Sequence, residues 1–451
     1  MKYGTRTSKD IQVSMRIDGS FHLSDGVAFE RLISKNPHKP LSEFCDSIFT
    51  AGRNKRTYTK KGYGYPYLSN SDAIAQNPFN SCKYNSRKYG YDESAFLKEG
   101  MVLTGRVGAI GQTAYVTKEY EKKEAMGSDN IIRIIAKPSE YSGYIYSFLS
   151  SKIGNILLWK LAAGGVQPYI TDQMVANIPV PIFPETKQQE IHNLIVESAN
   201  LRVEANRLLE EAQNILTENI CYNSSDKKLY SCVSSKSLRN SFTRRFEADY
   251  YVDEGEKIAN HIKNNLDYKS LKEVTSDIFR PGIFKRVYVN KGITFLGGSD
   301  IMQRIPSSEK QLSSTKTKNI KSLMLEKGWI LVTCGGTIGN SVFVDSEIAK
   351  CAASQHILRL IPQDIPAGYL FAFINSNLGK KIIQRYTYGS VIPQVEPIHI
   401  ERIPVPLLNL ALIESINKLA MDSITKNEIS KKKELEAIHL VEQEISLWQQ
   451  S

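Results

Sequence analysis

The chain of 451 residues is long enough to form two to four domains, each with a core of its own. Its composition, with 41% hydrophobic and 23% charged residues, is typical of a globular protein and argues against wholesale disorder. The sequence has no run of about 18 apolar residues that would predict a membrane helix, and its first residues lack the apolar stretch of a secretory signal, so we expect a cytoplasmic protein. The net charge of +11 favours a polyanionic partner such as nucleic acid.

An internal repeat with a period of about 225 to 230 residues organises the chain. The longest match pairs residues 97–116 (LKEGMVLTGRVGAIGQTAYV) with residues 325–344 (LEKGWILVTCGGTIGNSVFV). Shorter matches keep the same order: residues 16–21 with 245–250, 48–56 with 278–286, 128–134 with 354–360, and the sequence Ile-Pro-Val-Pro at 178–181 and 403–406. The chain is therefore predicted to contain two similar domains.

Each repeat is predicted to be a domain of mixed helix and strand followed by one long helix. Short β-rich runs at residues 101–104 and 329–333 alternate with glycine turns, and helical stretches follow at residues 144–158 and 369–383. The two Ile-Pro-Val-Pro segments are expected to end the domains, because proline interrupts both helices and strand ladders. The predicted segments are a first domain at residues 1–183, a long helix at 184–221, a serine-rich linker at 222–243, a second domain at 244–407 and a second long helix at 408–449.

The long helix of the first repeat carries a seven-residue pattern. Two columns recur along it, made of Leu194, Leu201, Leu208 and Ile215, and of Ile191, Ser198, Ala205 and Ala212. By itself this pattern also fits an ordinary amphipathic surface helix, but the second long helix offers a partner through a less regular stripe that includes Leu412, Ile416 and Leu419. Since a domain separates the two helices in the chain, they are expected to run antiparallel. We therefore predict an α+β protein in which two similar domains are separated by two long antiparallel, coiled-coil-like helices about a pseudo-two-fold axis.

The sequence shows no motif of catalysis or of metal binding. The glycine runs at residues 105–111 and 334–339 lack the features of a phosphate-binding loop and of a dinucleotide fold, so their glycines are expected to form tight turns. Six scattered cysteines form no CxxC pair and seven histidines are isolated, which favours reduced thiols and gives no support to a metal site. Asp72 and Asp300 occupy equivalent positions of the two repeats, but one acidic residue per domain more often caps a turn than performs catalysis.

Basic residues mixed with aromatic residues form two clusters at matching positions of the repeat. The first cluster consists of Arg53, Lys55, Arg56, Tyr58, Lys60, Lys61, Lys83, Arg87 and Lys88. The second cluster consists of Arg280, Lys285, Arg286, Lys291, Lys310, Lys316 and Lys318. Because Arg and Lys neutralise phosphates and Arg also reads base edges, we predict that both clusters bind double-stranded DNA, although each residue taken singly also fits a solvated loop. Arg16 and Arg245 fit either DNA contacts or ion pairs with Asp18 and Glu247.

Taken together, these features resemble the specificity (S) subunit of Type I restriction–modification systems over essentially the whole chain. The resemblance rests on the duplicated domain, the G-x-[IV]-G turns at residues 108–111 and 336–339, the Ile-Pro-Val-Pro exits, and the segments 164–170 (GGVQPYI) and 389–395 (GSVIPQV). It implies a protein that is not an enzyme. Each domain would be a target-recognition domain that reads one half of a split DNA sequence, and the helices, roughly 50 Å long at about 1.5 Å per residue, would fix the gap between the halves.

The resemblance also implies partners. Two methylation (M) subunits would supply S-adenosylmethionine binding and adenine methylation, and restriction (R) subunits would join through the M complex and add ATP- and Mg-dependent cleavage. No cofactor is therefore expected on this chain itself.

Two other functions stay open. The same kind of subunit would serve a methylation-only or other phage-defence system equally well. A bivalent scaffold that binds protein ligands through its domains is the alternative without DNA, and the basic, aromatic loops argue against it.

Overall fold

The computed structural model describes residues 5, 7–8, 11–12, 15–89, 91–223, 233–243 and 245–448. The chain divides into two compact units, of which unit 1 comprises residues 1–203 with 429–451 and unit 2 comprises residues 204–428. Each unit therefore contains the mixed domain of one repeat, half of its long helix, and half of the long helix of the other repeat. In the described part of the chain, the helices are all too short or too polar to cross a membrane.

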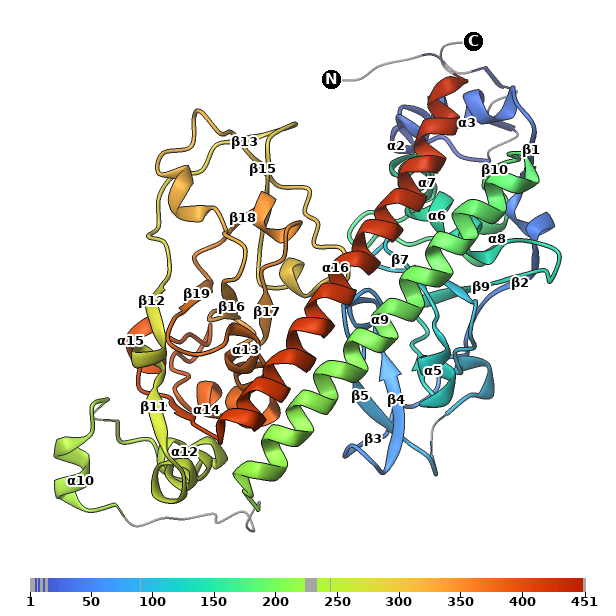
Figure 1. The fold of residues 1–451 in the computed structure, drawn as a ribbon. Coiled ribbons are helices and arrows are strands. Elements are labelled where there is room, and N and C mark those ends of the chain that lie inside the picture. Colours follow the sequence, from blue (N-terminus) through green and yellow to red (C-terminus); the bar gives the residue numbers. More distant parts are fainter. Residues whose placement is uncertain are drawn as a thin grey trace. The chain divides into compact units, whose positions relative to one another are not determined.

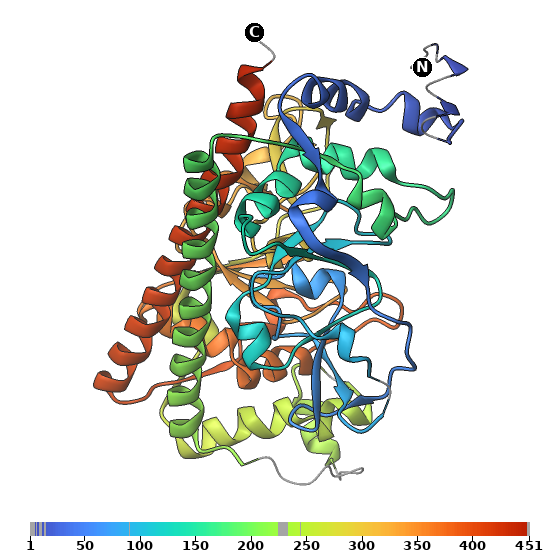
Figure 2. The same ribbon diagram turned by 90° about the vertical axis from the view of Figure 1, so that its right-hand side faces the viewer.

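A four-stranded antiparallel sheet, called here the large sheet, lies in each unit (Figures 1 and 2). In unit 1 its order is β2 (Cys45–Thr50), β9 (Ile131–Ala136), β6 (Val102–Gly105) and β7 (Thr113–Tyr115). In unit 2 the order is β12 (Thr275–Phe279), β19 (Ile357–Pro362), β16 (Ile330–Thr333) and β17 (Ser341–Phe343). All residues of β6 and β16 are buried, which explains their nearly continuous apolar sequences. The repeat seen in the sequence is thus a repeat of strand order.

A second four-stranded sheet, called the small sheet, accompanies each large sheet. In unit 1 it consists of β3 (Tyr58–Thr59), β5 (Lys83–Ser86), β4 (Gly64–Leu68) and β8 (Met126–Gly127). In unit 2 it consists of β13 (Tyr288–Val289), β15 (Gln311–Leu312), β14 (Ile293–Leu296) and β18 (Ala352–Ala353). In both units the last strand pairs in parallel and the others antiparallel.

The two proline-rich exits also form strands. β10 (Pro179–Pro181) pairs with β1 (His38–Pro40), and β20 (Pro404–Pro406) pairs with β11 (Tyr268–Ser270), each antiparallel. The segments were expected only to end the domains. They pair because the central residue, Val180 or Val405, keeps a backbone N–H and lies opposite Lys39 or Lys269. Each two-stranded sheet thus fixes the segment that directly precedes a long helix.

Two helices follow the large sheet in each unit, α6 (Ser142–Ser150) and α7 (Lys152–Leu161) in unit 1, and α13 (Ala367–Asn375) and α14 (Asn377–Arg385) in unit 2. The sequence predicted one helical stretch in each place. The helix breaks at Ser151 and at Ser376, which adopt an extended conformation and accept the backbone N–H of Gly154 and Gly379 through their hydroxyls, each at 3.1 Å. A serine is a strong N-cap, so the second helix starts there.

Short helices complete both units. Unit 1 adds α2 (Gly19–His22), α3 (Gly26–Ser34), η1 (Leu41–Phe44), α4 (Asn70–Ala73), η2 (Glu93–Ala95), α5 (Lys118–Lys122) and α8 (Asp172–Ala176). Unit 2 adds α10 (Ser235–Asn240), α11 (Ala248–Val252), α12 (Glu254–Asn265), η3 (Leu271–Val274), η4 (Asp300–Met302), η5 (Ile320–Leu323), η6 (Ile348–Lys350) and α15 (Pro397–Ile400). Of the predicted linker 222–243, residues 224–232 lie outside the described residues, and α10 is a helix that the turn-like composition did not predict.

A fully buried arginine lies on the second strand of each large sheet. Arg133 on β9 donates hydrogen bonds to the carbonyl oxygens of Ala95, Gly127, Ser128 and Ile131. Its repeat equivalent Arg359 on β19 donates to Ala353, Ser354 and Ile357. Burial lowers the pKa of each guanidinium to about 10, so both remain charged at neutral pH. Each arginine fastens the strand that precedes it, β8 or β18 of the small sheet, to the large sheet.

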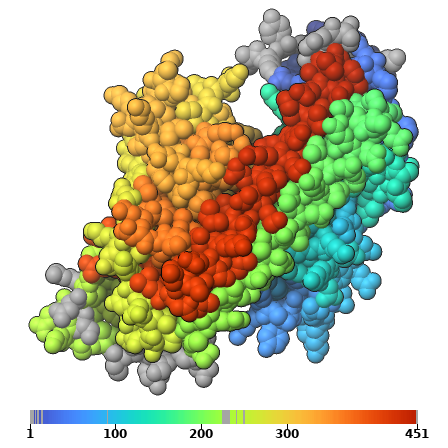
Figure 3. Space-filling view, in the orientation of Figure 1, coloured from blue at the N-terminus to red at the C-terminus, as the bar shows by residue number. Residues whose placement is uncertain are grey.

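The two long helices are α9 (Glu185–Ile220) and α16 (Leu410–Leu447), and in each unit half of one lies beside half of the other (Figure 3). In unit 1 Lys187 lies 4.0 Å from Glu444, and Lys433 lies 2.9 Å from Glu197. Residue numbers rise along α9 while they fall along α16, so the halves are antiparallel. This confirms the predicted fold class: α+β, with two similar domains and long paired helices.

Buried positions recur along both long helices. On α16 they include a series at alternating steps of three and four residues: Ile413, Ile416, Ala420, Ser423, Asn427, Ser430, Glu434, Ala437 and Val441. On α9 they are Gln188, Ile191, Ile195, Ser198, Ala199, Arg202, Ala205, Asn206, Leu208, Ala212, Leu216 and Ile220. The contact between the helices is called the seam below. Of the residues predicted to pair the helices, Ile191, Leu208 and Ile416 are buried, whereas Leu194, Leu201, Ile215, Leu412 and Leu419 are half-buried. Leu194, Ile215 and Leu419 pack against core clusters that contain residues of both long helices and of the domains.

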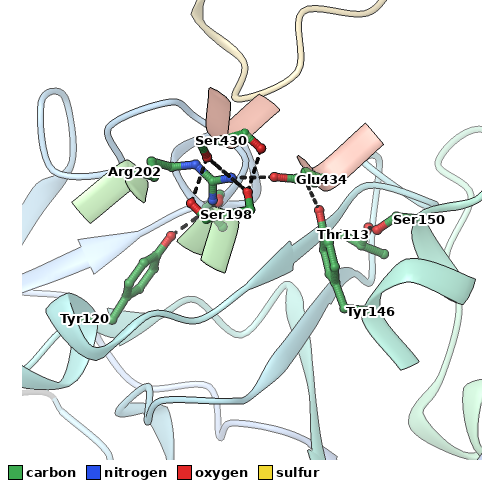
Figure 4. A network of polar contacts seen from close by, with 9 residues as sticks. Thr113, Tyr120, Tyr146, Ser150, Ser198, Arg202, Ser430 and Glu434 are labelled. Atoms are coloured by element: carbon green, nitrogen blue, oxygen red, sulfur yellow. Dashed lines mark hydrogen bonds and ion pairs between the residues drawn. The ribbon is translucent and has the colours of Figure 1, made fainter. Parts of the chain in front are cut away.

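The middle of the seam is polar. In unit 1 the hydroxyl of Ser198 donates to the carbonyl oxygen of Ser430 (2.8 Å), and the hydroxyl of Ser430 donates to the carbonyl oxygen of Ser198 (2.7 Å). Beside them, Arg202 forms a buried ion pair with Glu434, whose other carboxylate oxygen accepts the hydroxyl of Tyr146 on α6 (Figure 4). Ser198 belongs to the predicted column of Ile191, Ser198, Ala205 and Ala212, whereas the ion pair of Arg202 with Glu434 was not predicted.

In unit 2 the Ser423 hydroxyl donates to the Ala205 carbonyl at 2.7 Å, which repeats the Ser198–Ser430 contact because the helices align at an offset of about 225 residues. The same offset places Phe371, Asn427 and Leu209 at the positions of Tyr146, Arg202 and Glu434. The buried ion pair is therefore a property of unit 1.

Candidate nucleic-acid interface

Three loops of unit 1 meet at one end of its large sheet. Strands β2 and β6 end there and strands β7 and β9 begin there, because the sheet is antiparallel. The loop 51–57, the glycine turn 106–112 and the turn 128–130 consequently lie together. Their proximity is shown by the hydrogen bond from Arg106 N to Asn130 O at 2.8 Å and by Arg53 Nε, which lies 3.4 Å from Asp129 Oδ2.

The small sheet brings the two halves of the first basic cluster together. Tyr58 on β3 lies opposite Asn85 on β5, so sequence neighbours of both strands share one surface. The Lys83 ammonium lies 4.7 Å from the ring centroid of Tyr58, and the Arg87 guanidinium lies 4.5 Å from that of Tyr65. Such cation–π contacts hold long basic side chains over the sheet while their charges stay exposed. Exposed members of this cluster are Arg53, Lys55, Arg56, Tyr58, Lys60, Lys61, Lys83, Arg87 and Lys88.

Carboxylates engage three arginines of this cluster. Asp129 pairs with both Arg53 and Arg56, and Glu124 lies 2.9 Å from Arg87. Arg56 also lies over the ring of Tyr67, at 5.5 Å from its centroid. These arginines are therefore oriented by their neighbours, whereas the lysines project from the sheet and its turns.

Unit 2 repeats this layout with different side chains. Lys285, Lys291, Lys310, Lys316 and Lys318 are exposed on the segments around β13, β14 and β15, whose pairing brings them together. Arg280 is half-buried and forms an ion pair of 2.6 Å with Glu396, and Arg286 donates to the side-chain oxygen of Gln355. Gln355 is the repeat equivalent of Asp129, so a neutral residue in unit 2 stands where a carboxylate stands in unit 1.

The recurring glycines and acidic residues have structural roles. Gly108 and Gly336 have φ values of +73° and +79°, and Gly111 and Gly339 have +80° and +86°, as the predicted tight turns require. The Asp72 carboxylate accepts the backbone N–H of Ser69 at 2.9 Å, and the Asp300 carboxylate accepts that of Gly297 at 2.8 Å. Both aspartates cap turns.

Arg16 and Arg245 are engaged in ion pairs. Arg16 lies 2.7 Å from Asp18 and donates to the carbonyl oxygens of Leu161 and Ala162, and Arg245 lies 3.2 Å from Glu247 and donates to the carbonyl oxygen of Thr387. Of the two roles considered for these arginines, the structure supports the ion pairs.

Two short hairpins at this end of the large sheets were not predicted as site elements. Residues 163–169 in unit 1 and 388–394 in unit 2 close through paired backbone hydrogen bonds and carry an exposed valine at the tip. The recurrence of Gly-x-Val and of proline in both segments could have indicated these hairpins. The sequence alone did not show that they lie beside the basic loops.

Grouped metal ligands are absent from the described residues, and Cys45 and Cys334 are buried in the domain cores. Among them, no group of three or more His, Cys, Asp or Glu side chains is placed to hold a metal ion. Burial raises the pKa of Cys45 to about 12 and that of Cys334 to about 11, so both thiols stay protonated. Cys232 lies outside the described residues.

Comparison with known proteins gives a match to one family. The sequence model of the Type I restriction modification DNA specificity domain matches residues 37–204 and again residues 265–438, together more than half of the chain. A search of curated protein sequences gave no match.

Solved structures that the chain matches include S subunits of Type I systems. The S subunit from M. genitalium is 16% identical, with 91% of this chain and 94% of that chain covered and a TM-score of 0.35. The HsdS subunit from Thermoanaerobacter tengcongensis is 14% identical, with 90% and 94% covered and a TM-score of 0.28. A chain from a study of complex assembly in the type I R-M system is 15% identical, with 91% and 96% covered and a TM-score of 0.30. Because the family model matches each repeat separately, the chain belongs to the family of Type I restriction–modification DNA specificity domains and contains that domain twice.

Proposed function

We propose that this chain is a DNA-specificity subunit that reads a bipartite double-stranded target, one half-site per recognition domain. In this proposal it carries no catalytic centre and directs two methylation subunits, and through them restriction subunits, to the target. S-adenosylmethionine, ATP and Mg²⁺ belong to those partners.

One observation supports the proposal most strongly. In each unit, strand pairing in the small sheet gathers basic side chains that are far apart in sequence, and does so at equivalent positions of the repeat. The position of the positive surface is kept, while its side chains differ: Arg53 corresponds to Ile283, and Asp129 to Gln355. Two domains that recognise different half-sites need DNA-binding surfaces at equivalent positions with different side chains.

The first experiment measures DNA binding and methylation together. Replacing Arg53, Lys55 and Arg56 by alanine should change the sites that are methylated in cells by altering one half of the recognised sequence only. It should also lower the slope of log affinity against log salt by roughly 0.9 for each phosphate contact that is lost, with Lys55, which pairs with no carboxylate among the described residues, as the first such contact.

A matched control removes three exposed lysines outside the clusters, Lys35, Lys39 and Lys418, and should alter neither readout. Unchanged methylation sites in the Arg53, Lys55 and Arg56 variant would mean that these residues are only surface charge. DNA binding that is insensitive to salt in the wild-type chain would favour the protein-binding scaffold.

The second experiment tests the helix pair as a spacer. An insertion in one helix alone would shift the Ser198–Ser430 register, so seven residues should be inserted in both helices, after Val203 and after Glu428. Seven residues add about 10.5 Å to a helix, which is about three base pairs. We expect the gap in the methylated sequence to grow by about three base pairs, and an unchanged gap would refute the spacer.

Whether the system restricts or only methylates is a property of the partners. Mapping methylated adenines in cells with and without this chain tests whether the chain directs methylation to particular sequences. Phage plating on the same cells tests whether the system restricts. Methylation without protection against phage would assign the chain to a methylation-only system.

A further inference from the structure

The hairpin of each unit presents an apolar tip to solvent. Val166 at the tip of hairpin 163–169 is fully exposed, and Val391 at the tip of hairpin 388–394 is 90% exposed. The two valines are repeat equivalents. Figure 2 shows hairpin 163–169 projecting from unit 1 on the side away from α9. A single exposed valine is ordinary, so the informative feature is that it recurs at matching positions of the repeat.

Backbone hydrogen bonds fix both hairpins in shape. Ala163 and Tyr169 exchange two bonds of 2.9 Å, and Tyr388 and Gln394 exchange bonds of 3.0 and 2.8 Å. Gly164 and Gly389, each with φ of +90°, permit the turn into the tip. These backbone hydrogen bonds therefore fix the hairpin conformation in which the valines are exposed to solvent.

Further backbone bonds join each hairpin to the glycine turn at the end of the large sheet. Gly108 N donates to Pro168 O at 3.3 Å, and Ile170 N donates to Arg106 O at 2.9 Å. In unit 2, Gly336 N donates to Pro393 O and Val395 N donates to Cys334 O, both at 3.0 Å. The hairpins thus belong to the same sheet end as the basic loops.

The charge around the tips is suited to a polyanion. In unit 2 the hairpin residue Tyr388 donates its hydroxyl to Glu396 at 2.7 Å, and the same carboxylate pairs with Arg280 of the second basic cluster. In unit 1 Asp129 at this sheet end is shared by Arg53 and Arg56, and Asp172 accepts the hydroxyl of Thr50. One carboxylate at this end of each unit is thus paired with arginines of the basic clusters.

We propose that Val166 and Val391 are apolar DNA contacts: each hairpin tip enters a groove of the duplex and packs against its sugars. A groove of B-DNA about 12 Å wide admits a two-stranded ribbon, and proteins insert apolar side chains between or against bases beside basic anchors. The inference rests on the proposed function.

The repeat also indicates what the tips contact. The basic loops differ between the units, as readers of different half-sites should, whereas the tip keeps valine, the glycine before it and the proline after it. A contact kept in both units touches what both half-sites share. The tips therefore contribute affinity that is independent of sequence and of salt.

The experiment compares uncharged variants on a duplex of mixed sequence with the full chain. Val166→Ser and Val391→Ser remove apolar surface without changing charge, and each should weaken binding about tenfold, with the double variant near 100-fold. The slope of log affinity against log salt should stay unchanged, because no phosphate contact is lost. As the ionic counterpart, Lys60→Ala with Lys61→Ala should lower that slope by roughly 1.8.

Two controls make the result specific. Leu410→Ser removes an aliphatic side chain that is 70% exposed at the first residue of α16, and it should not alter DNA binding. Gly164→Ala and Gly389→Ala keep the valines but disfavour the backbone that presents them, and they should weaken binding as the valine variants do.

Several results would overturn the inference. Valine variants that bind DNA like the wild-type chain would exclude the tips as DNA contacts while leaving the proposed function intact. Variants that bind DNA normally but fail to copurify with methylation subunits would make the tips a protein interface. A wild-type chain that does not bind DNA would overturn the proposed function and this inference with it.

Discussion

The backbone N–H of Gly143, in the first turn of α6, donates a hydrogen bond of 3.0 Å to Nδ1 of His192 on α9. Their repeat equivalents are Gly368 on α13 and Asn417 on α16, and there the amide oxygen accepts the same bond at 3.0 Å. In each unit a long helix thus caps the helix that it packs against. The imidazole titrates and the amide does not, which makes the two units respond differently to pH.

We expect acid to weaken unit 1 at this contact. Burial lowers the pKa of His192 below its ordinary value of 6.5, and Nδ1 accepts a bond only when it is unprotonated. The stabilisation is therefore complete above pH 6.5 and is lost as the pH falls through the lowered pKa of the folded state. Loss of the bond should cost about 1 kcal/mol. Urea unfolding at about pH 7.5 and about pH 5.5 measures this, with His192→Asn as the control that should show the smaller pH dependence. Equal pH dependence of both proteins would rule out His192 as the titrating group.

Alanine at Gly143 should destabilise unit 1. Its Cβ would lie 2.9 Å from both Nδ1 and the carbonyl oxygen of His192, so the helices would have to separate. The expected loss is about 1–3 kcal/mol by thermal or urea unfolding, more than the roughly 1 kcal/mol that alanine gains in a helix. Gly165→Ala is the matched control, since its Cβ would meet no atom within 4 Å. A Gly143→Ala protein as stable as the control would show that the helix contact is not tight.

The buried ion pair of the seam should be replaceable by its repeat counterpart. Glu434→Leu alone leaves Arg202 buried without its carboxylate and removes the acceptor of Tyr146, and it should cost about 3–5 kcal/mol. Adding Arg202→Asn and Tyr146→Phe reproduces the side chains that unit 2 carries at these positions, and most of the stability should return. Urea unfolding of the single and triple variants measures the difference. A triple variant as unstable as the single one would mean that unit 1 depends on the ion pair itself.

Asp129→Gln should make unit 1 resemble unit 2 in charge. It removes the carboxylate that pairs with Arg53 and Arg56 and places there the residue type of Gln355. If the loop binds DNA, the freed arginines should tighten binding to mixed-sequence duplexes and steepen the salt slope by roughly 0.9 per added phosphate contact. Weaker binding at all salt concentrations would instead assign Asp129 a role in keeping the loop folded.

The sequence predicted the repeat, the fold class and the position of the basic loops, because each depends on local order. Residues 97–116 and 325–344 recur with the same turn glycines, and the same large-sheet strands follow from them. The aromatic and basic runs around Tyr58 and Lys83 were recognisable without knowing that β3 and β5 pair.

The predicted column of Ile191, Ser198, Ala205 and Ala212 is buried throughout, whereas the predicted column of larger residues is buried only at Leu208. Arg202 and Glu434 were not expected between the helices, because a buried ion pair carries no apolar signal in the sequence. Arg133 was missed for a similar reason: a charged residue in a strand predicts an exposed face, and only the carbonyl oxygens of a neighbouring turn show why it is inside.

The core of unit 1 contains Ala437, Val441 and Ile445 from the far end of α16, packed with Ile191 and Ile195 of α9. A ribosome makes about 5–20 residues per second, so residues that complete this core emerge roughly 12 to 50 seconds after the helix they cover. During that interval the apolar side chains of α9 that these residues cover stay exposed. Nascent-chain folding is therefore ordered by the pairing of the helices: the domain that is synthesised first is completed last, and chaperone contact should concentrate on residues 185–203 until residues 437–445 have emerged.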